Sequence, residues 1–131
     1  MPHPVELTVY PDQCDTFGHL NQASYLALFE RARWEVLRQG PGMDVFTRNN
    51  IWPAVRKATV GYHAGVWPGD VLRFDIALLH RGRTSFTLRQ NAVRASDNVT
   101  VATLECVYVC IDRSEQPVPV NDEILAAFGG S

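Results

Sequence analysis

The chain has 131 residues, of which 46% are hydrophobic and 20% charged, the composition of an ordinary globular protein. This length predicts one domain spanning residues 1–131, with a hydrophobic core of its own and no room for a second domain. The formal net charge of −2 gives no general attraction to nucleic acid, so no nucleic-acid partner is expected. The start MPHPVEL is unlike a secretory signal, and apolar runs of about five residues are too short to span a membrane. We therefore expect a cytoplasmic protein without a membrane partner.

Two segments in the first third of the chain show clear periodicity. In residues 5–10 (VELTVY) apolar and polar residues alternate, which predicts a half-buried strand. Residues 22–39 carry apolar side chains at helical spacing and are followed by Gly40-Pro41-Gly42, which predicts a long amphipathic helix that ends there. Its apolar stripe consists of Tyr25, Leu28, Phe29, Ala32 and Val36. Irregular structure is expected from there through residues 49–50.

Most of the remaining chain has the patterns of strands. Turn sequences at 67–70, 81–83 and 96–98 separate segments that predict four long antiparallel strands up to about residue 112. The alternation within residues 72–78 indicates one continuous strand. In the last strand, one face is expected to carry Val99, Val101, Val107, Val109 and Ile111. A short helix is expected at residues 122–128.

This order of elements predicts an α+β domain, in which one five-stranded antiparallel sheet packs against a single long helix. One helix cannot cover both faces of such a sheet. The other face, or an edge, is therefore expected to contact a second subunit, in a homodimer or a homotetramer.

The stretch DTFGHLNQASY, residues 15–25, concentrates the polar residues that suggest a site. In a structural interpretation, Asn21 caps the helix, Asp15 caps a turn and Gly18 supplies a positive φ. In a functional interpretation, the unpaired N–H groups at the helix start polarise a carbonyl oxygen, and an upstream carboxylate faces the carbonyl carbon. That second arrangement suits acyl transfer. The residues alone leave both interpretations open.

A longer run, VYPDQCDTFGHLNQASYLALFERAR, resembles the signature of hotdog-fold acyl-CoA thioesterases of the 4-hydroxybenzoyl-CoA thioesterase-like family. Asp15, Gly18, Tyr25 and the run from Phe29 to Arg33 match that pattern. The later segments GVWPGDVL, RGRTSF and VYVCIDRSEQPVPV also resemble the family, in the same order. The resemblance implies a hotdog fold, in which a single antiparallel sheet wraps around one long central helix, and a thioester hydrolase that acts on acyl-CoA.

The resemblance also implies site residues. Asp15 takes the place of the catalytic carboxylate, as nucleophile or as general base, and the backbone N–H of Gln22 that of the group polarising the carbonyl. Asn21 then lies beside the thioester, and Gly18 and Tyr25 contribute to substrate binding. Many bacterial members have His at the position of Gln22 and Tyr at that of Asn21, so this chain departs from them. The spacing of Asp15, His19 and Asn21 is similar to that of plant acyl-carrier-protein thioesterases, although their additional Asn falls at Phe17 here.

His19 therefore has two possible roles, support of catalysis or packing of the loop.

The phosphates of coenzyme A require cations. Arg56 and Lys57 are candidates, and the segment that resembles the family's CoA-contacting strand offers Arg81, Arg83, Thr84 and Ser85. Arginine-rich strand ends are also common without a ligand. Coenzyme A would be part of substrate and product, so no cofactor is expected. The histidines show no paired spacing, and no metal site is expected.

Three further features have a structural and a functional interpretation. Cys14, beside Asp15, has no charged partner that would activate it, which favours packing, and three unpaired cysteines predict free thiols. Glu30 fits an exposed helix position better than a second catalytic carboxylate. Trp34, Trp52 and Trp67 line either the core, an acyl pocket or a subunit interface. The alternative to an enzyme is a non-catalytic acyl-CoA-binding hotdog protein.

Overall fold

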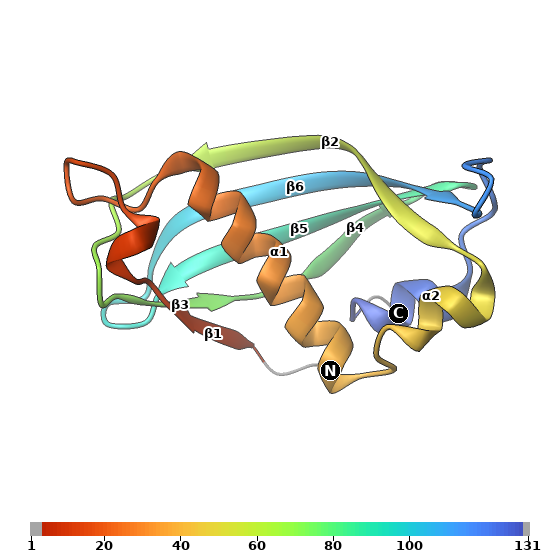
Figure 1. The fold of residues 1–131 in the computed structure, drawn as a ribbon, viewed down its shortest axis with the longest axis horizontal. Coiled ribbons are helices and arrows are strands. Elements are labelled where there is room, and N and C mark those ends of the chain that lie inside the picture. Colours follow the sequence, from red (N-terminus) through yellow and green to blue (C-terminus); the bar gives the residue numbers. More distant parts are fainter. Residues whose placement is uncertain (1–3, 130–131) are drawn as a thin grey trace.

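A computed structural model of the protein describes residues 4–129 (Figure 1). One six-stranded antiparallel sheet and one long helix make up most of the fold. The elements in chain order are β1 (Val5–Thr8), η1 (Pro11–Gln13), α1 (Gln22–Gln39), α2 (Asp44–Asn49), β2 (Trp52–Tyr62), β3 (Val71–Phe74), β4 (Ala77–Arg81), β5 (Ser85–Arg94), β6 (Val99–Ile111) and α3 (Asp122–Ala127). Among these residues, no helix is both long and apolar enough to cross a membrane.

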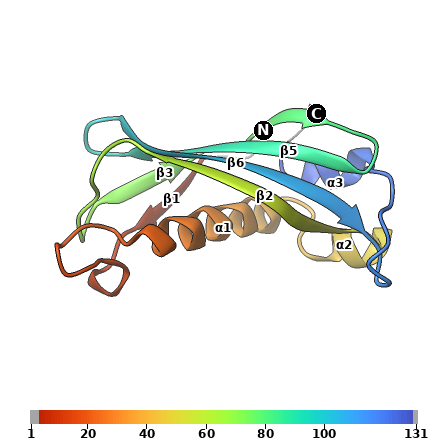
Figure 2. The ribbon, with the colours of Figure 1, turned by 90° about the horizontal axis from the view of Figure 1, so that it is seen from above.

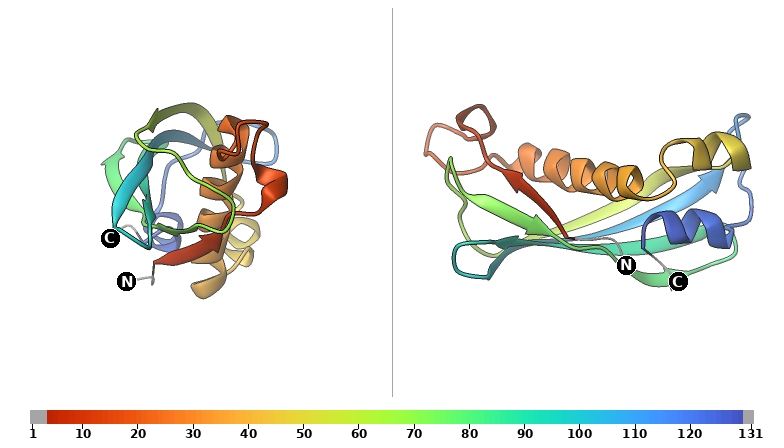
Figure 3. Two further views of the ribbon diagram at one scale, coloured as in Figure 1. Left: turned by 90° about the vertical axis from the view of Figure 1, so that its left-hand side faces the viewer. Right: turned by 90° about the horizontal axis from the view of Figure 1, so that it is seen from below.

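The fold has two layers. Figure 2 shows α1 lying along one face of the sheet, and the end-on view in Figure 3 shows the sheet curving around it. The core between the layers includes Leu28 and Phe29 of α1, and the Phe29 ring meets that of Phe74 edge-on at 5.3 Å. Burying a large apolar side chain completely contributes about 1.5–3 kcal/mol, so this one interface stabilises much of the domain. The expected α+β arrangement of one sheet and one central helix is confirmed.

Helix α1 has the predicted bounds, Gln22–Gln39, because its start and stop signals are local. At its end, the N–H groups of Gly40 and Gly42 both donate to the carbonyl oxygen of Leu37. Gly42 has a φ of +74°, which a residue with a side chain rarely adopts. The two glycines therefore provide hydrogen bonds to a carbonyl oxygen of the last turn and direct the chain away from the helix.

The sheet has the order β1-β3-β5-β6-β2, and β4 pairs with β5 beyond the end of β3. The predicted single strand over residues 72–78 is therefore wrong, because it divides into β3 and β4. Asp75 causes the interruption: its Oδ1 accepts a hydrogen bond of 2.9 Å from the Asn91 N–H, a donor on β5. The five expected strands thus become six.

The prediction that five apolar residues of β6 share one face is also wrong. Ala92 of β5 pairs with Ala102, but Val93 pairs with Thr100, so Val101 is an extra residue in a β-bulge. After this bulge the alternation shifts, and Val101 is fully buried whereas Val99 is exposed. Val107 and Val109 lie on the face away from α1, since their neighbours Cys106 and Tyr108 are buried.

Two short helices close the end of the fold where α1 finishes (Figure 1). The sequence predicts α3, but the stretch before residue 50 was expected to be irregular and instead forms α2. A helix of six residues is too short for its periodicity to be recognised, and Asn50 ends it in the left-handed conformation, with φ 53°. The two helices are joined by an Asn121–Asn49 hydrogen bond of 2.9 Å and an Arg48–Glu123 ion pair.

Candidate active site

The loop that leads into α1 is held together by Asp15. Its Oδ1 accepts hydrogen bonds from the backbone N–H groups of Phe17, at 2.9 Å, and His19, at 3.3 Å. The Asp15 N–H donates in turn to the His19 carbonyl oxygen at 2.9 Å. Asp15 thus caps a turn, as the structural interpretation predicts. Its Oδ2 has no hydrogen-bond partner within residues 4–129 and is available to a ligand.

Gly18 allows this loop to pack closely. Its φ is +87°, and a Cβ placed on it would lie 3.2 Å from the Trp67 ring. The neighbouring His19 also contacts Trp67, with ring centroids 4.1 Å apart. The positive φ and the close approach both require glycine here. Of the three tryptophans, Trp67 is therefore a support for the loop.

The start of α1 leaves one donor free. Asn21 caps the helix, and its Oδ1 accepts a hydrogen bond of 2.8 Å from the Ala23 N–H. Its carbonyl oxygen accepts from Ser24 and Tyr25. The N–H of Gln22 has no partner in the described part of the chain. It lies at the positive end of an 18-residue helix, where a partial negative charge is stabilised.

A surface cavity of about 380 Å³ joins the loop and the helix start. Asp15, His19, Gln22 and Tyr25, four of the predicted site residues, line it together with Leu20 and Tyr62. Asn21 and Gly18 do not line the cavity. Asn21 caps the helix, and Gly18 provides the positive φ in the loop. The two parts of the predicted site are therefore brought together.

Tyr62 is a polar residue of the cavity that the sequence did not predict. It is the last residue of β2 and pairs with Ala102, which places its ring 5.0 Å from that of Tyr25. Its hydroxyl donates to the Gln22 carbonyl oxygen at 3.5 Å. Burial raises the pKa of Tyr25, so that hydroxyl stays protonated and donates to the Ala64 carbonyl oxygen. No local signal marks Tyr62, because its role depends on the sheet register.

The residues of the segment that resembles a CoA-contacting strand lie at the other end of the sheet. Ser85 pairs with Val109, near the Trp52 end of β2, whereas the cavity adjoins its Tyr62 end. Arg81 forms an ion pair with Asp122 and also donates to the Val120 carbonyl oxygen. Arg83 is exposed, and Thr84 follows it at the tip of the same turn. Within one chain these four residues do not join the cavity.

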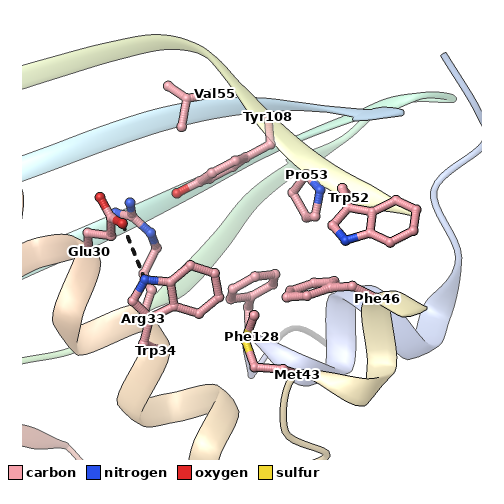
Figure 4. A pocket seen from close by; sticks show the side chains of 10 residues that line it. All are labelled: Glu30, Arg33, Trp34, Met43, Phe46, Trp52, Pro53, Val55, Tyr108 and Phe128. Carbon is pink, nitrogen blue, oxygen red and sulfur yellow. Dashed lines mark hydrogen bonds between the residues drawn. The ribbon is translucent and has the colours of Figure 1, made fainter. Parts of the chain in front are cut away.

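A second cavity, of about 250 Å³, lies between α1 and the Trp52 end of β2 (Figure 4). Its wall is largely apolar and is formed by Trp34, Met43, Phe46, Trp52, Pro53, Val55 and Phe128, with Glu30, Arg33 and Tyr108 as polar groups. Burial raises the pKa of Tyr108, whose hydroxyl has no hydrogen-bond partner in the described residues. The Arg33 guanidinium lies 5.6 Å from the centre of that ring. Two of the three tryptophans thus line a pocket.

Two exposed apolar residues, one on α1 and one on β2, lie between the residues that line the two cavities. Leu26 of α1 lies between them along the helix and is 42% exposed. Ala58 of β2 pairs with the buried Cys106, so it lies on the face toward α1, yet it too is exposed. Leu26 and Ala58 therefore leave apolar surface exposed between the start of α1 and the apolar cavity.

In the described residues, no three His, Cys, Asp or Glu side chains come together in a way that could hold a metal ion. The chemistry that the cavity offers is that of a carboxylate and of backbone donors at a helix start.

A single antiparallel sheet wrapped around one long helix, with a carboxylate-bearing loop at the helix start, defines a hotdog protein. The solved structure of YbaW, a probable thioesterase from Escherichia coli, has the same fold, with a TM-score of 0.84 at 24% identity over 95% of this chain and 94% of that one. Residues 9–128 match the model of the thioesterase-like superfamily, and the chain belongs to that family. The expected fold, family and enzyme class, a thioester hydrolase, are thereby confirmed.

Two relatives have names that describe an activity. The acyl-CoA thioester hydrolase YbgC from Escherichia coli is 31% identical over 122 residues, which are 92% of this chain and 90% of that protein. The long-chain acyl-CoA thioesterase FadM from Escherichia coli is 28% identical over 102 residues, 78% of this chain and 77% of that protein. Only the second name specifies an acyl group, so the acyl group of this chain is to be inferred from its own cavities.

Cys14 is expected to be unreactive despite its place beside Asp15. Partial burial raises the pKa of its thiol, and the negative charges of Asp15 and Asp12 raise it further. Because the thiolate is the reactive form, Cys14 should react with iodoacetamide at pH 7 more slowly than free cysteine, and the rate should rise with pH. Cys106 and Cys110 are buried, so mass spectrometry of the Cys14 peptide follows this reaction separately. Faster alkylation than free cysteine at pH 7 would instead make Cys14 a candidate nucleophile.

Proposed function

We propose that this protein hydrolyses acyl-CoA thioesters in the cavity lined by Asp15 and Gln22. The observation that carries the proposal is that Asp15, with one carboxylate oxygen unpartnered, and Gln22, with an unpaired N–H at the helix start, line the same cavity. The names of two relatives, an acyl-CoA thioester hydrolase and a long-chain acyl-CoA thioesterase, support the same substrate class.

In the proposed mechanism the thioester carbonyl oxygen accepts a hydrogen bond from the Gln22 N–H. The dipole of α1 and this N–H then stabilise the negative charge that develops on that oxygen. Asp15 either attacks the carbonyl carbon, giving an anhydride that water then hydrolyses, or takes a proton from an attacking water. The C–S bond breaks in both routes, and coenzyme A leaves as the thiol while the acyl group leaves as the free acid.

Two further residues support this geometry in the proposal. Asn21 keeps the Gln22 N–H free by capping α1 through the next donor along the helix, Ala23. His19 packs on Trp67 and donates its backbone N–H to Asp15, so its contribution is to position the carboxylate. Of its two possible roles, this contact pattern favours packing of the loop.

Replacement of Asp15 by Asn separates its role as a turn cap from its proposed role in catalysis. The amide oxygen of Asn can still accept from Phe17 and His19, so the Asp15→Asn protein should keep its fold and melting temperature. It should lose nearly all release of free thiol from acyl-CoA, by a factor of about 10³ or more, because an amide is neither nucleophile nor base. Asp12→Asn, in the adjacent η1, is the matched control and should retain activity.

The outcomes are distinct. Equal activity of wild type and Asp15→Asn would contradict the assignment of Asp15. Binding of acyl-CoA by both proteins without release of thiol would favour the alternative, a non-catalytic acyl-CoA-binding protein.

The acyl chain is proposed to lie along α1, from the Asp15 cavity to the apolar cavity. From Gln22 to Arg33 the helix advances about 16 Å, at ~1.5 Å per residue. An extended chain advances roughly 1.3 Å per carbon, given C–C bonds of about 1.5 Å. An acyl group of about ten to twelve carbons would therefore reach the apolar cavity beside Trp34 and Val55. The preferred substrates are medium- to long-chain acyl-CoAs.

Ala58→Phe tests this path. A phenyl ring on the face of β2 toward α1 should block the proposed path between the two cavities, so kcat/KM for decanoyl-CoA should fall at least about tenfold. Hydrolysis of butyryl-CoA, which ends before Ala58, should stay within about twofold of wild type. Thr59→Phe, which pairs with Glu105 on the opposite face, is the matched control. An equal loss for both chain lengths would contradict the proposed path.

We also propose a homodimer formed through β2. This 11-residue strand is the last in the sheet order, so one of its edges carries unpaired N–H and C=O groups. Val55 on this strand is an exposed apolar side chain, as are Leu26 and Trp34 on α1. A two-fold axis would pair β2 with its copy in antiparallel fashion and set the Trp52 end of one strand beside the Tyr62 end of the other.

This arrangement would complete the site. The turn at Gly82 in the second copy would approach the first chain's cavity from the Trp52 end of its own sheet. Arg83 is exposed and without an ion-pair partner among the described residues, so it is the candidate cation for the phosphates of coenzyme A. Arg81 is engaged with Asp122, and its role is to hold α3.

The dimer can be tested without any substitution. Light scattering should give a mass of at least two 14.7 kDa chains, and hydrogen exchange should show protection along the whole of β2. A free edge would leave about every second N–H of β2 exposed and quickly exchanging. A particle of one chain, or a larger particle whose β2 amides exchange quickly, would contradict pairing through this strand.

A further inference from the structure

Three consecutive backbone carbonyl oxygens near the cavity each accept a hydrogen bond from a different part of the fold. They belong to residues 64–66, called here the strap, which follow β2. The Ala64 oxygen accepts from the Tyr25 hydroxyl at 3.4 Å, and the Val66 oxygen accepts from the Leu20 N–H at 2.8 Å. Between them, the Gly65 oxygen accepts from Nη1 of Arg94 at 2.7 Å. The strap is therefore fixed at three adjacent points.

Two of these points belong to the wall of the cavity. Leu20 and Tyr25 both line it, and Leu20 lies directly between His19 and the helix cap Asn21. The strap also supports His19, because a Cβ on Gly65 would lie 3.4 Å from the imidazole Cδ2. The position of the strap thus sets how the Asp15 loop sits relative to the start of α1.

The hydrogen bond from Arg94 to the Gly65 oxygen connects the strap to the sheet. Arg94 ends β5, and its guanidinium makes a paired contact with Asp97, from Nε to Oδ1 at 3.0 Å and from Nη2 to Oδ2 at 2.8 Å. Asp97 is itself held by the Val99 N–H at 3.2 Å. Hydrogen bonding to Arg94 lowers the pKa of Asp97, which keeps the pair charged at neutral pH. With its charge paired, Arg94 is a rigid support and a poor site for a phosphate.

We propose that Arg94 is a positioning residue for thioester hydrolysis, acting through the Gly65 carbonyl. It holds the strap against the β5–β6 hairpin, and the strap in turn holds Leu20 and Tyr25, so that Asp15 and the Gln22 N–H face one reacting carbonyl. Arg94 itself is not among the residues that line the cavity. The inference rests on the proposed function, since it concerns the geometry of that same site.

Arg94→Met removes the hydrogen bond to the strap, and Arg73→Met is the matched control. Arg73 also binds the hairpin, through Asn98 at 3.0 Å, and has no hydrogen bond to the strap among the described residues. Because small misplacements of reacting groups are costly, kcat of Arg94→Met for decanoyl-CoA should fall about 10- to 100-fold, with KM within about threefold of wild type. Arg94→Lys, which keeps a donor for the Gly65 oxygen, should recover part of kcat, and Arg73→Met should match wild type.

A measurement independent of turnover separates this inference from the proposed function. In Arg94→Met, the Leu20 amide, which donates to Val66 of the strap, should exchange with solvent at least about tenfold faster, whereas in Arg73→Met it should be unchanged. If Arg94→Met does not fold, Asp97→Asn, which weakens the same pair, should move kcat and exchange in the same direction.

Equal kcat and equal Leu20 exchange in Arg94→Met and Arg73→Met would overturn the positioning role. A rise in KM alone would overturn it as well, because it would place Arg94 in substrate binding. If the wild type hydrolyses no acyl-CoA, the proposed function fails, and the exchange comparison still decides whether Arg94 holds the loop.

Discussion

The hydrogen bond from the Ala23 N–H to the Asn21 side chain fixes where α1 begins, and the proposed site depends on that position. A cap one residue earlier or later would present a different N–H to the cavity or satisfy the one at Gln22. The helix is held by burial of its apolar stripe in the curved sheet, so its start cannot slide relative to Tyr62. One capping contact and one packed helix together leave the Gln22 N–H unpaired at the end of α1 that adjoins the cavity.

The sequence predicted those parts of the fold that local signals determine. The bounds of α1 follow from a cap residue and a glycine-rich stop, and both lie within three residues of the helix ends. The interruption at Asp75 and the bulge at Val101 were not predicted, because each depends on the strand paired with it rather than on its own neighbours. The short α2 was missed because six residues give too little periodicity, and Asn50 alone is an ambiguous stop.

In the candidate site, too, the sequence predicted the residues that are close together in the chain and missed those that are brought in by the sheet. Asp15, His19 and Gln22 lie within eight residues of one another, so a sequence motif places them together and the cavity contains all three. Tyr62 and the Arg94–Gly65 contact join the site from segments about 40 to 75 residues away, through sheet register, which no motif encodes. Arg81 to Ser85 resemble a CoA-contacting segment, but one chain holds them at the far end of the sheet.

A crystal structure of the Asp15→Asn protein with a bound acyl-CoA tests the central claim most directly. The thioester oxygen should lie about 2.7–3.1 Å from the Gln22 nitrogen. The carbonyl carbon should face the side chain of residue 15 at about 3–3.5 Å. A thioester whose oxygen is held by another donor, or that lies away from the start of α1, would contradict the assignment of this cavity as the active site.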